Sequence, residues 1–117
     1  VKDAAALANE NAGRNGVKAA YISGKTENRL KDLLQGIPQA DTVILDPPRQ
    51  GLQKDVAKTI AAYGAKNILY ISCDPASLSR DLQELTKLYR VVSAKPFDLF
   101  PRTAHVECVV LMSRVNK

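Results

Sequence analysis

The stretch that decides the fold is NILYISCDPASLSRDL, residues 67–82. It opens with apolar, β-favouring residues and changes after Cys73 to a pattern typical of a helix. Asp74 is a good helix N-cap and Pro75 fits the first helical position, so we predict a strand at 67–71 followed by a helix. The buried stripe of this helix would consist of Leu78, Leu82, Leu85 and Leu88. Cys73 therefore lies on the turn between a strand and a helix.

Strand and helix patterns alternate along most of the chain. The expected helices are residues 3–15, closed by Gly16, then a helix with Leu30, Leu33 and Leu34 on one face, and residues 53–63, closed by Gly64. The other expected strands are 17–23 and 42–45, and then 89–100 and 105–114, which should pair antiparallel because no helix fits between them. Strands that alternate with helices form parallel sheets. The predicted fold class is therefore α/β, with a mostly parallel sheet and a C-terminal antiparallel strand pair.

Composition and charge are those of an ordinary globular chain, one domain or part of one. The 17 Lys and Arg against 12 Asp and Glu give a net charge of +5, a bias that suits a polyanionic partner. No apolar run approaches the ~20 residues of a membrane helix, and the N-terminal residues lack a signal-peptide pattern. We therefore expect a cytoplasmic protein with no membrane partner. Two cysteines without a CxxC motif or a Cys/His cluster argue against a metal site.

Two polar residues follow consecutive predicted strands. Asp46 ends the strand 42–45, which two prolines stop, and Cys73 ends the strand 67–71. Open α/β sheets bind ligands outside the carboxyl ends of their strands, so both residues would lie at the edge where a site is expected. Together they predict a site better than either does alone.

Three motifs carry a resemblance to a known family: LDPPRQGL at 45–52, YISCDPASLSRDL at 70–82 and DLFPRTAHVECVVLMSR at 98–114. In this order and spacing they resemble the C-terminal half of RNA uracil-5-methyltransferases, which transfer a methyl group from S-adenosylmethionine to carbon 5 of a uridine in rRNA or tRNA. The resemblance implies a Rossmann-like class I methyltransferase fold, with residues 1–117 as the C-terminal portion of the catalytic domain. Where the family usually has Asn, this chain has Asp74.

The resemblance also implies that the first two strands of that fold are missing, with the glycine-rich turn that holds the methyl donor. In the family's strand order, 3-2-1-4-5-7-6, the segment 17–23 would be the third strand and 42–45 the fourth, separated by a gap. We expect the gap to close by pairing of these two strands, or the exposed edges to drive self-association. A fragment of this extent is expected to be inactive by itself.

The resemblance assigns two catalytic residues. Cys73 would be the nucleophile that adds to carbon 6 of the base, and Glu107 the general base that removes the proton from carbon 5. A turn at a helix N-terminus also suits a thiolate, because the partial positive charge there favours it. The alternatives are that Cys73 is a small buried hydrophobe and that Glu107 faces solvent from an edge strand. Cys108 alternates with Val106 and Val110 and is expected to pack on their buried face.

Further site residues are assigned in the same way. Asp46 resembles the residue that methyltransferases place between the methyl donor and the target base, although Asp before Pro is also a common turn former. Thr26 and Glu27 lie where the family contacts the adenine end of the donor, or Thr26 simply caps its helix. Residues that could contact RNA phosphates or order the loops are Arg49, Arg80, Arg102 and His105.

Other functions compete with this one. An adenine amino-methyltransferase also uses an acidic-Pro-Pro motif, but it needs an aromatic residue after the prolines, where this chain has Arg49. A non-catalytic RNA-binding or packing module of Rossmann-like fold would use the positive charge without turnover. A redox or receiver-like domain would need a second cysteine near Cys73 or an acidic pair after its first strand, and the sequence has neither.

Overall fold

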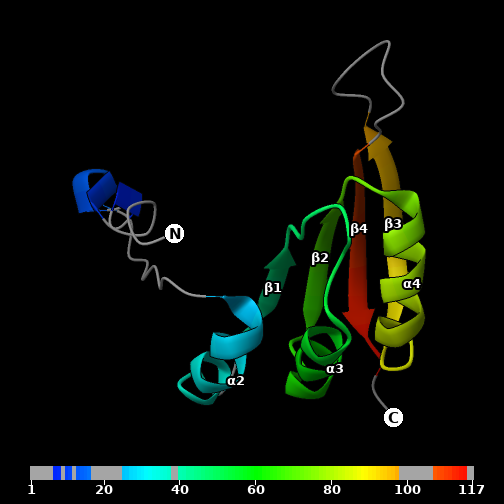
Figure 1. Ribbon diagram of the computed structural model, residues 1–117, viewed down its shortest axis with the longest axis horizontal. Helices are drawn as coiled ribbons and strands as arrows, with labels where there is room; N and C mark the ends of the chain where they lie inside the picture. Colours follow the sequence, from blue (N-terminus) through cyan, green and yellow to red (C-terminus); the bar gives the residue numbers. More distant parts are fainter. Residues whose placement is uncertain are drawn as a thin grey trace.

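The computed structural model describes residues 7–8, 10–11, 13–16, 25–37, 40–97 and 107–115. Its elements are α2 (Thr26–Gln35), β1 (Thr42–Leu45), α3 (Lys54–Tyr63), β2 (Asn67–Ser72), α4 (Pro75–Leu85), β3 (Tyr89–Phe97) and β4 (Glu107–Arg114) (Figure 1). Helices and strands alternate up to α4, and two strands follow. The predicted α/β class and the order of its elements are confirmed over this part of the chain.

The strands of the described part form one sheet in the order β1-β2-β4-β3. β1 and β2 are parallel, whereas β4 is antiparallel to both β2 and β3. The predicted antiparallel C-terminal pair is thus confirmed, with a register irregularity between Val91 and Ser93. The predicted parallel strand 17–23 lies outside the described residues, and so does the gap that it would border.

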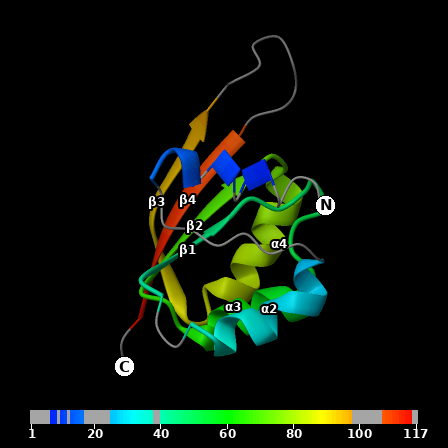
Figure 2. The same cartoon turned by 90° about the vertical axis from the view of Figure 1, so that its left-hand side faces the viewer.

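Helices α2, α3 and α4 cover one face of the sheet (Figure 2). Alternate residues of the two central strands point toward these helices and are buried, namely Ile68, Tyr70, Val110 and Met112. The helices contribute to the same core with Val56, Ile60, Leu78 and Leu85. Each buried Ile, Leu, Val or Met side chain stabilises the fold by about 1.5 to 3 kcal/mol. This apolar layer fixes the position of the strand ends and of the loops that leave them.

Local signals set the ends of the helices. The Asp74 carboxylate accepts a hydrogen bond from the Ser77 amide (3.0 Å), and Pro75 is the first residue of α4, as predicted. α3 ends at Gly64, whose φ of 79° lies in the left-handed region that favours glycine. The predicted helix 53–63 and strand 67–71 each differ from the observed element by a single residue at one end.

The predicted leucine stripes differ from the structure in two details. α4 ends at Leu85, so Leu88 lies in the turn that follows, although it still packs against the core. In α2, Leu30 packs against the core but Leu33 is exposed. α2 lies beside β1 at the edge of the sheet, so part of its apolar face is left open (Figure 1).

Part of the first predicted helix is described, upstream of α2. Helical geometry is found at residues 7, 8, 10, 11, 13 and 14, and Gly16 has a φ of 68°, the predicted left-handed end. An exposed ion pair between Arg14 and Glu10 (2.6 Å) joins neighbouring turns of this segment. In the part of the chain that the structure describes, no helix combines the length and the apolar character that crossing a membrane requires.

Candidate active site

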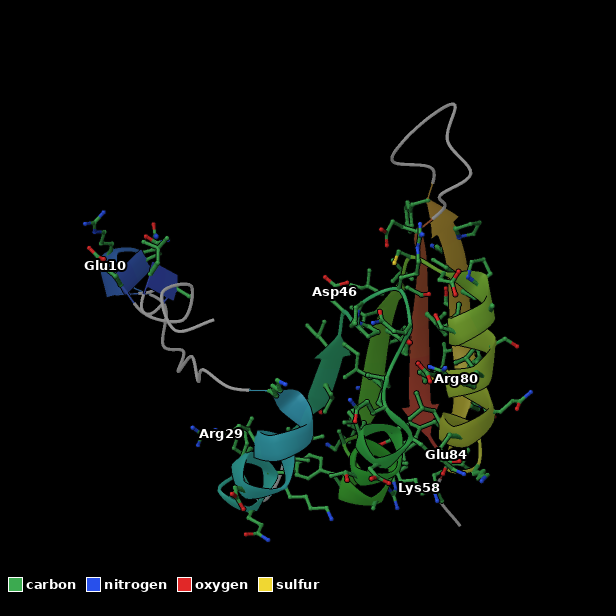
Figure 3. All side chains as sticks on the ribbon, viewed as in Figure 1. Glu10, Arg29, Asp46, Lys58, Arg80 and Glu84 are labelled. Atoms are coloured by element: carbon green, nitrogen blue, oxygen red, sulfur yellow. The ribbon has the colours of Figure 1, made fainter. Side chains whose placement is uncertain are left out.

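Two loops begin at the same edge of the sheet. β1 and β2 are parallel and pair as far as Leu45 with Tyr70, so their carboxyl ends point the same way. Asp46 follows β1 directly, and Cys73 follows β2. Figure 3 shows Asp46 at the tip of β1, on this edge. The structure thus brings Asp46 and Cys73 to the edge where the sequence predicts a site.

The turn that carries Cys73 is held on both sides. The Ser72 hydroxyl donates a hydrogen bond to the Asp74 carbonyl oxygen (3.0 Å) and accepts one from the Asp74 amide (3.1 Å). The Asp74 carboxylate caps α4, and the hydrogen bond from the Ser77 amide holds the pKa of Asp74 below its ordinary value. Cys73 has a free thiol and is half-buried, so it is neither sealed in the core nor fully exposed.

Glu107 begins β4, next to this turn. β4 runs antiparallel to β2, and Cys108 pairs with Ser72. Glu107 itself pairs with Phe97 of β3, and it lies at the end of β4 that is next to the Cys73 turn. The Glu107 side chain is half-buried, which leaves it accessible to a ligand at the sheet edge.

Cys108 lies on the other face of β4. It packs against the core in which Val110 is buried, which confirms the packing role predicted for it; Val106 lies outside the described residues. Because residues alternate between faces along a strand, Glu107 belongs to the face opposite α3 and α4. Cys108 also lines an apolar cavity of about 510 Å³ on the helix side, together with Pro75, Leu78, Leu82 and Pro96.

Side chains of α4 bind the loop that follows β1. The Ser77 hydroxyl donates to the Arg49 carbonyl oxygen (2.8 Å). The Arg80 guanidinium donates to the carbonyl oxygens of Gln50 and Leu52. Figure 3 shows Arg80 projecting from α4. These contacts favour the loop-ordering role among the two that the sequence leaves open for Arg80.

Asp81 is buried beneath the same loop, with 3% of its surface exposed. One carboxylate oxygen accepts hydrogen bonds from the Leu52 amide (2.8 Å) and the Tyr70 hydroxyl (2.5 Å). Burial and then the hydrogen bond to Asp81 raise the pKa of Tyr70 far above its ordinary value, so the phenol stays protonated and keeps donating. Sequence reasoning missed both residues. The available signal was an acidic residue three positions after Leu78, on the buried side of the predicted helix.

The structure describes only some of the other predicted site residues. Thr26 and Glu27 begin α2, but their side chains lie outside the described part of the structure. Arg102 and His105 lie outside it entirely. Arg49 is exposed on the loop that follows β1. The binding roles of these residues stay predictions.

A cavity of about 620 Å³ extends from α2 and β1 to the loop after β1. Its lining is apolar at Leu34 and Val43 and becomes polar at Asp46 and Gln50. Asp46 therefore offers a carboxylate at one end of an otherwise apolar cavity. Among the residues that the structure describes, no group of three or more His, Cys, Asp and Glu side chains is arranged to hold a metal ion.

The fold is that of S-adenosylmethionine-dependent methyltransferases. The M1.HpyAVI–SAM complex superposes with a TM-score of 0.63 over 80% of this chain and 52% of that one; at 15% identity this likeness shows the fold alone. The family model described as tRNA (Uracil-5-)-methyltransferase matches residues 13–115. The chain belongs to this family, which confirms the resemblance of its motifs.

Relatives and a solved structure agree with this membership. An uncharacterised RNA methyltransferase of Clostridium acetobutylicum is 44% identical over 109 residues, 92% of this chain and 24% of that protein. One from Caldanaerobacter subterraneus subsp. tengcongensis is 44% identical over 117 residues, 98% of this chain and 26% of that protein. The tRNA (uracil-54, C5)-methyltransferase of Pyrococcus abyssi, in complex with S-adenosyl-L-homocysteine, has a TM-score of 0.76 at 30% identity, covering 96% of this chain and 26% of that one. The chain spans about a quarter of the length of these proteins.

Proposed function

We propose that this chain is the C-terminal portion of the catalytic domain of an enzyme that methylates carbon 5 of a uridine in tRNA or rRNA, with S-adenosylmethionine as the methyl donor. The observation that carries the proposal is the pairing of Ser72 with Cys108, because Cys73 follows one member of this pair and Glu107 precedes the other. Family membership and the solved tRNA-modifying relative support the same substrate class. A chain of this extent would need the rest of the protein for turnover.

In this proposal Cys73 acts as the nucleophile. Carbon 5 of uracil is too weak a nucleophile to take up a methyl group, and addition of the Cys73 thiolate to carbon 6 moves the ring electrons onto carbon 5. A uridine in a folded RNA must leave its stack to reach the thiol. The hydrogen bonds of Ser72 to the Asp74 backbone support this role, because they hold the intervening cysteine in a fixed turn.

In this proposal Glu107 acts as the general base. Once carbon 5 carries the methyl group it still holds its original proton, and the Glu107 carboxylate removes that proton. The electrons of the broken C–H bond restore the double bond between carbons 5 and 6. The sulfur–carbon bond breaks in the same step, and its electron pair leaves with the Cys73 thiolate. The proposal is supported by the location of Glu107 on the strand antiparallel to the one that ends at the cysteine.

When bound, S-adenosylmethionine supplies an electrophilic methyl group on a positively charged sulfur. The residues of this chain fit one side of its site: the Asp46 carboxylate stands at the end of β1, beside an apolar cavity. An anionic side chain there suits the cationic donor and the polar edge of a base. Pro47 and Pro48 restrict the backbone after Asp46 and so limit its movement. Thr26 and Glu27 at the start of α2 would contact the adenine end.

An RNA substrate agrees with the charge of the chain. The net charge of +5 favours association with phosphates, and Arg49 is exposed beside the proposed site. Arg102 and His105 would add to this contact, and the proposed reaction would take place in the cytoplasm. Arginine at position 49 also argues against the adenine amino-methyltransferase, which needs an aromatic residue there.

The experiment that tests the proposal traps the adduct. RNA containing 5-fluorouridine is incubated with the intact protein and S-adenosylmethionine, because the base cannot remove fluorine from carbon 5 and the covalent complex persists. We expect a protein–RNA complex whose peptide map locates the RNA on Cys73, and no complex with Cys73→Ala. Cys108→Ala is the matched control and should form the adduct as the wild type does. An adduct that survives loss of Cys73 would contradict the proposal.

A further inference from the structure

The 49–52 loop is fastened to α4 along its length. Its carbonyl oxygens accept hydrogen bonds from Ser77 and Arg80, and the Leu52 amide donates to Asp81. The Asp81 carboxylate is almost fully buried, and its anchor on the sheet side is the Tyr70 hydroxyl. A buried carboxylate without such donors would be strongly destabilising. The Tyr70 hydroxyl and the Leu52 amide therefore fix the position of Asp81, and Asp81 in turn fixes theirs.

The contact between loop and helix is also close. Gly51 has a φ of 80°, and a Cβ atom there would lie 2.6 Å from the Asp81 carboxylate and 2.9 Å from the Ser77 Cβ. The loop backbone therefore rests directly on α4. The turn from Pro48 to Gly51 is closed by a backbone hydrogen bond of 2.8 Å, and Pro47 and Pro48 lead rigidly back to Asp46.

The same helix is also fixed to the cysteine turn, at its N-terminus. Asp74 caps the first turn of α4 through Ser77, and the Ser77 hydroxyl reaches the Arg49 carbonyl oxygen. The first two turns of α4 thus touch both the turn that carries Cys73 and the loop that follows Asp46. A displacement of either segment relative to the other would break hydrogen bonds to one helix.

We propose that Tyr70 and Asp81 are positioning residues for methyl transfer: through the 49–52 loop they fix Asp46 relative to Cys73. The proposal rests on the proposed function, since it takes Asp46 to act on the donor and the base and Cys73 to act on the base. Neither Tyr70 nor Asp81 touches substrate in this account. Their effect is geometric, and a loop that is only partly in place lowers the fraction of competent enzyme.

Tyr70→Phe tests the proposal, with Tyr89→Phe as the matched control. Both tyrosines are buried, and each hydroxyl makes a hydrogen bond of 2.5 Å, that of Tyr89 to the Ala65 carbonyl oxygen, away from the 49–52 loop. Each variant loses one oxygen and the hydrogen bond that it donates, and Tyr70→Phe should lower the unfolding midpoint more, because its partner is a buried carboxylate. Measurements are made on the intact enzyme at a temperature where both variants stay folded.

Two readouts separate positioning from stability. We expect hydrogen exchange of the Leu52 amide to accelerate about tenfold in Tyr70→Phe and to stay unchanged in Tyr89→Phe. We also expect kcat/KM for S-adenosylmethionine to fall about five- to tenfold in Tyr70→Phe alone. Ser77→Ala, which cuts the bond to the Arg49 carbonyl, should shift both readouts in the same direction.

Three results would overturn the proposal. Unchanged exchange at Leu52 in Tyr70→Phe would show that Tyr70 does not hold the loop. If Leu52 exchanges faster in Tyr70→Phe but kcat/KM for S-adenosylmethionine equals that of the Tyr89→Phe control, Tyr70 and Asp81 have only a structural role. A wild-type protein that methylates no uridine would contradict the proposed function and with it the catalytic half of this inference, while the exchange of Leu52 would still decide whether the loop is held.

Discussion

The contact between Gly51 and α4 yields a prediction with a magnitude. In Gly51→Ala, a residue with a side chain must adopt a φ of 80°, which costs about 1 to 2 kcal/mol. Its Cβ would also lie 2.6 Å from the Asp81 carboxylate. That oxygen accepts hydrogen bonds from Tyr70 and Leu52 and cannot move aside without losing them, so overpacking adds about 1 to 3 kcal/mol. We expect the free energy of unfolding to fall by about 2 to 5 kcal/mol.

Gly64→Ala provides the control that isolates the overpacking. Gly64 has nearly the same φ, 79°, but a Cβ there meets only the guanidinium of Arg114, the far end of a flexible side chain that can swing away. Both substitutions reduce the entropy of the unfolded chain equally, so that contribution cancels in the comparison. Gly64→Ala should therefore lose only the about 1 to 2 kcal/mol that the backbone conformation requires.

Urea unfolding, followed by far-ultraviolet circular dichroism, measures both variants against the wild type. Gly51→Ala should be the less stable of the two by about 1 to 3 kcal/mol. If the two variants fall within about 0.5 kcal/mol of each other, the 49–52 loop does not rest on Asp81 in the way described.

Three further predictions concern the site and the sheet edges. Asp46→Asn should raise KM for S-adenosylmethionine about tenfold or more, since hydrogen bonds to a charged group are the strong ones; unchanged kinetics would reduce Asp46 to a turn residue. Asp74 has a folded-state pKa below its ordinary 3.8, so its contribution to stability is complete above pH 3.8 and is lost as the pH falls through the lowered pKa. Asp74→Asn still caps the helix but does not titrate, so the loss of stability at acid pH should be smaller in this variant than in the wild type. An identical loss in both proteins would exclude Asp74 as its source. Ile44→Lys on β1 and Val92→Lys on β3 place charges on exposed positions of the two outer strands of the described sheet, and at least one should abolish the self-association expected of the isolated chain, as measured by sedimentation; equal association of all three proteins would exclude the strand edges.

Local signals made much of the fold predictable. The strand before Cys73 and the helix after it follow from a change of hydrophobic period with an N-cap and a proline at the boundary, so both ends of the strand and the start of the helix are predicted to within one residue. The end of the helix, by contrast, could not be predicted, as Leu88 shows. Its spacing continues the leucine stripe, but the backbone leaves the helix after Leu85, and spacing alone does not reveal that.

Some features of the candidate site are likewise predictable from the local sequence, and others are not. Asp46 and Cys73 are predictable as neighbours at one sheet edge because each ends a parallel strand, and this rule needs no knowledge of distant contacts. The bond between Tyr70 and Asp81, and the loop that rests on them, depend on how α4 packs against β2 and on the path of the chain between β1 and α3. No local pattern encodes that packing; only the acidic residue on an apolar helix face hints at a buried partner.

The proposed joint action of the Cys73 thiol and the Glu107 carboxylate is tested most directly by mass analysis of the RNA-bound Glu107→Gln protein. With unmodified RNA and S-adenosylmethionine, we expect Glu107→Gln to take up the methyl group but not to release the base, so that a methylated RNA accumulates covalently on Cys73. Glu84→Gln, a substitution on α4 where Glu84 pairs with Lys87, should turn over as the wild type does. Free 5-methyluridine RNA released by Glu107→Gln at the wild-type rate would contradict the account.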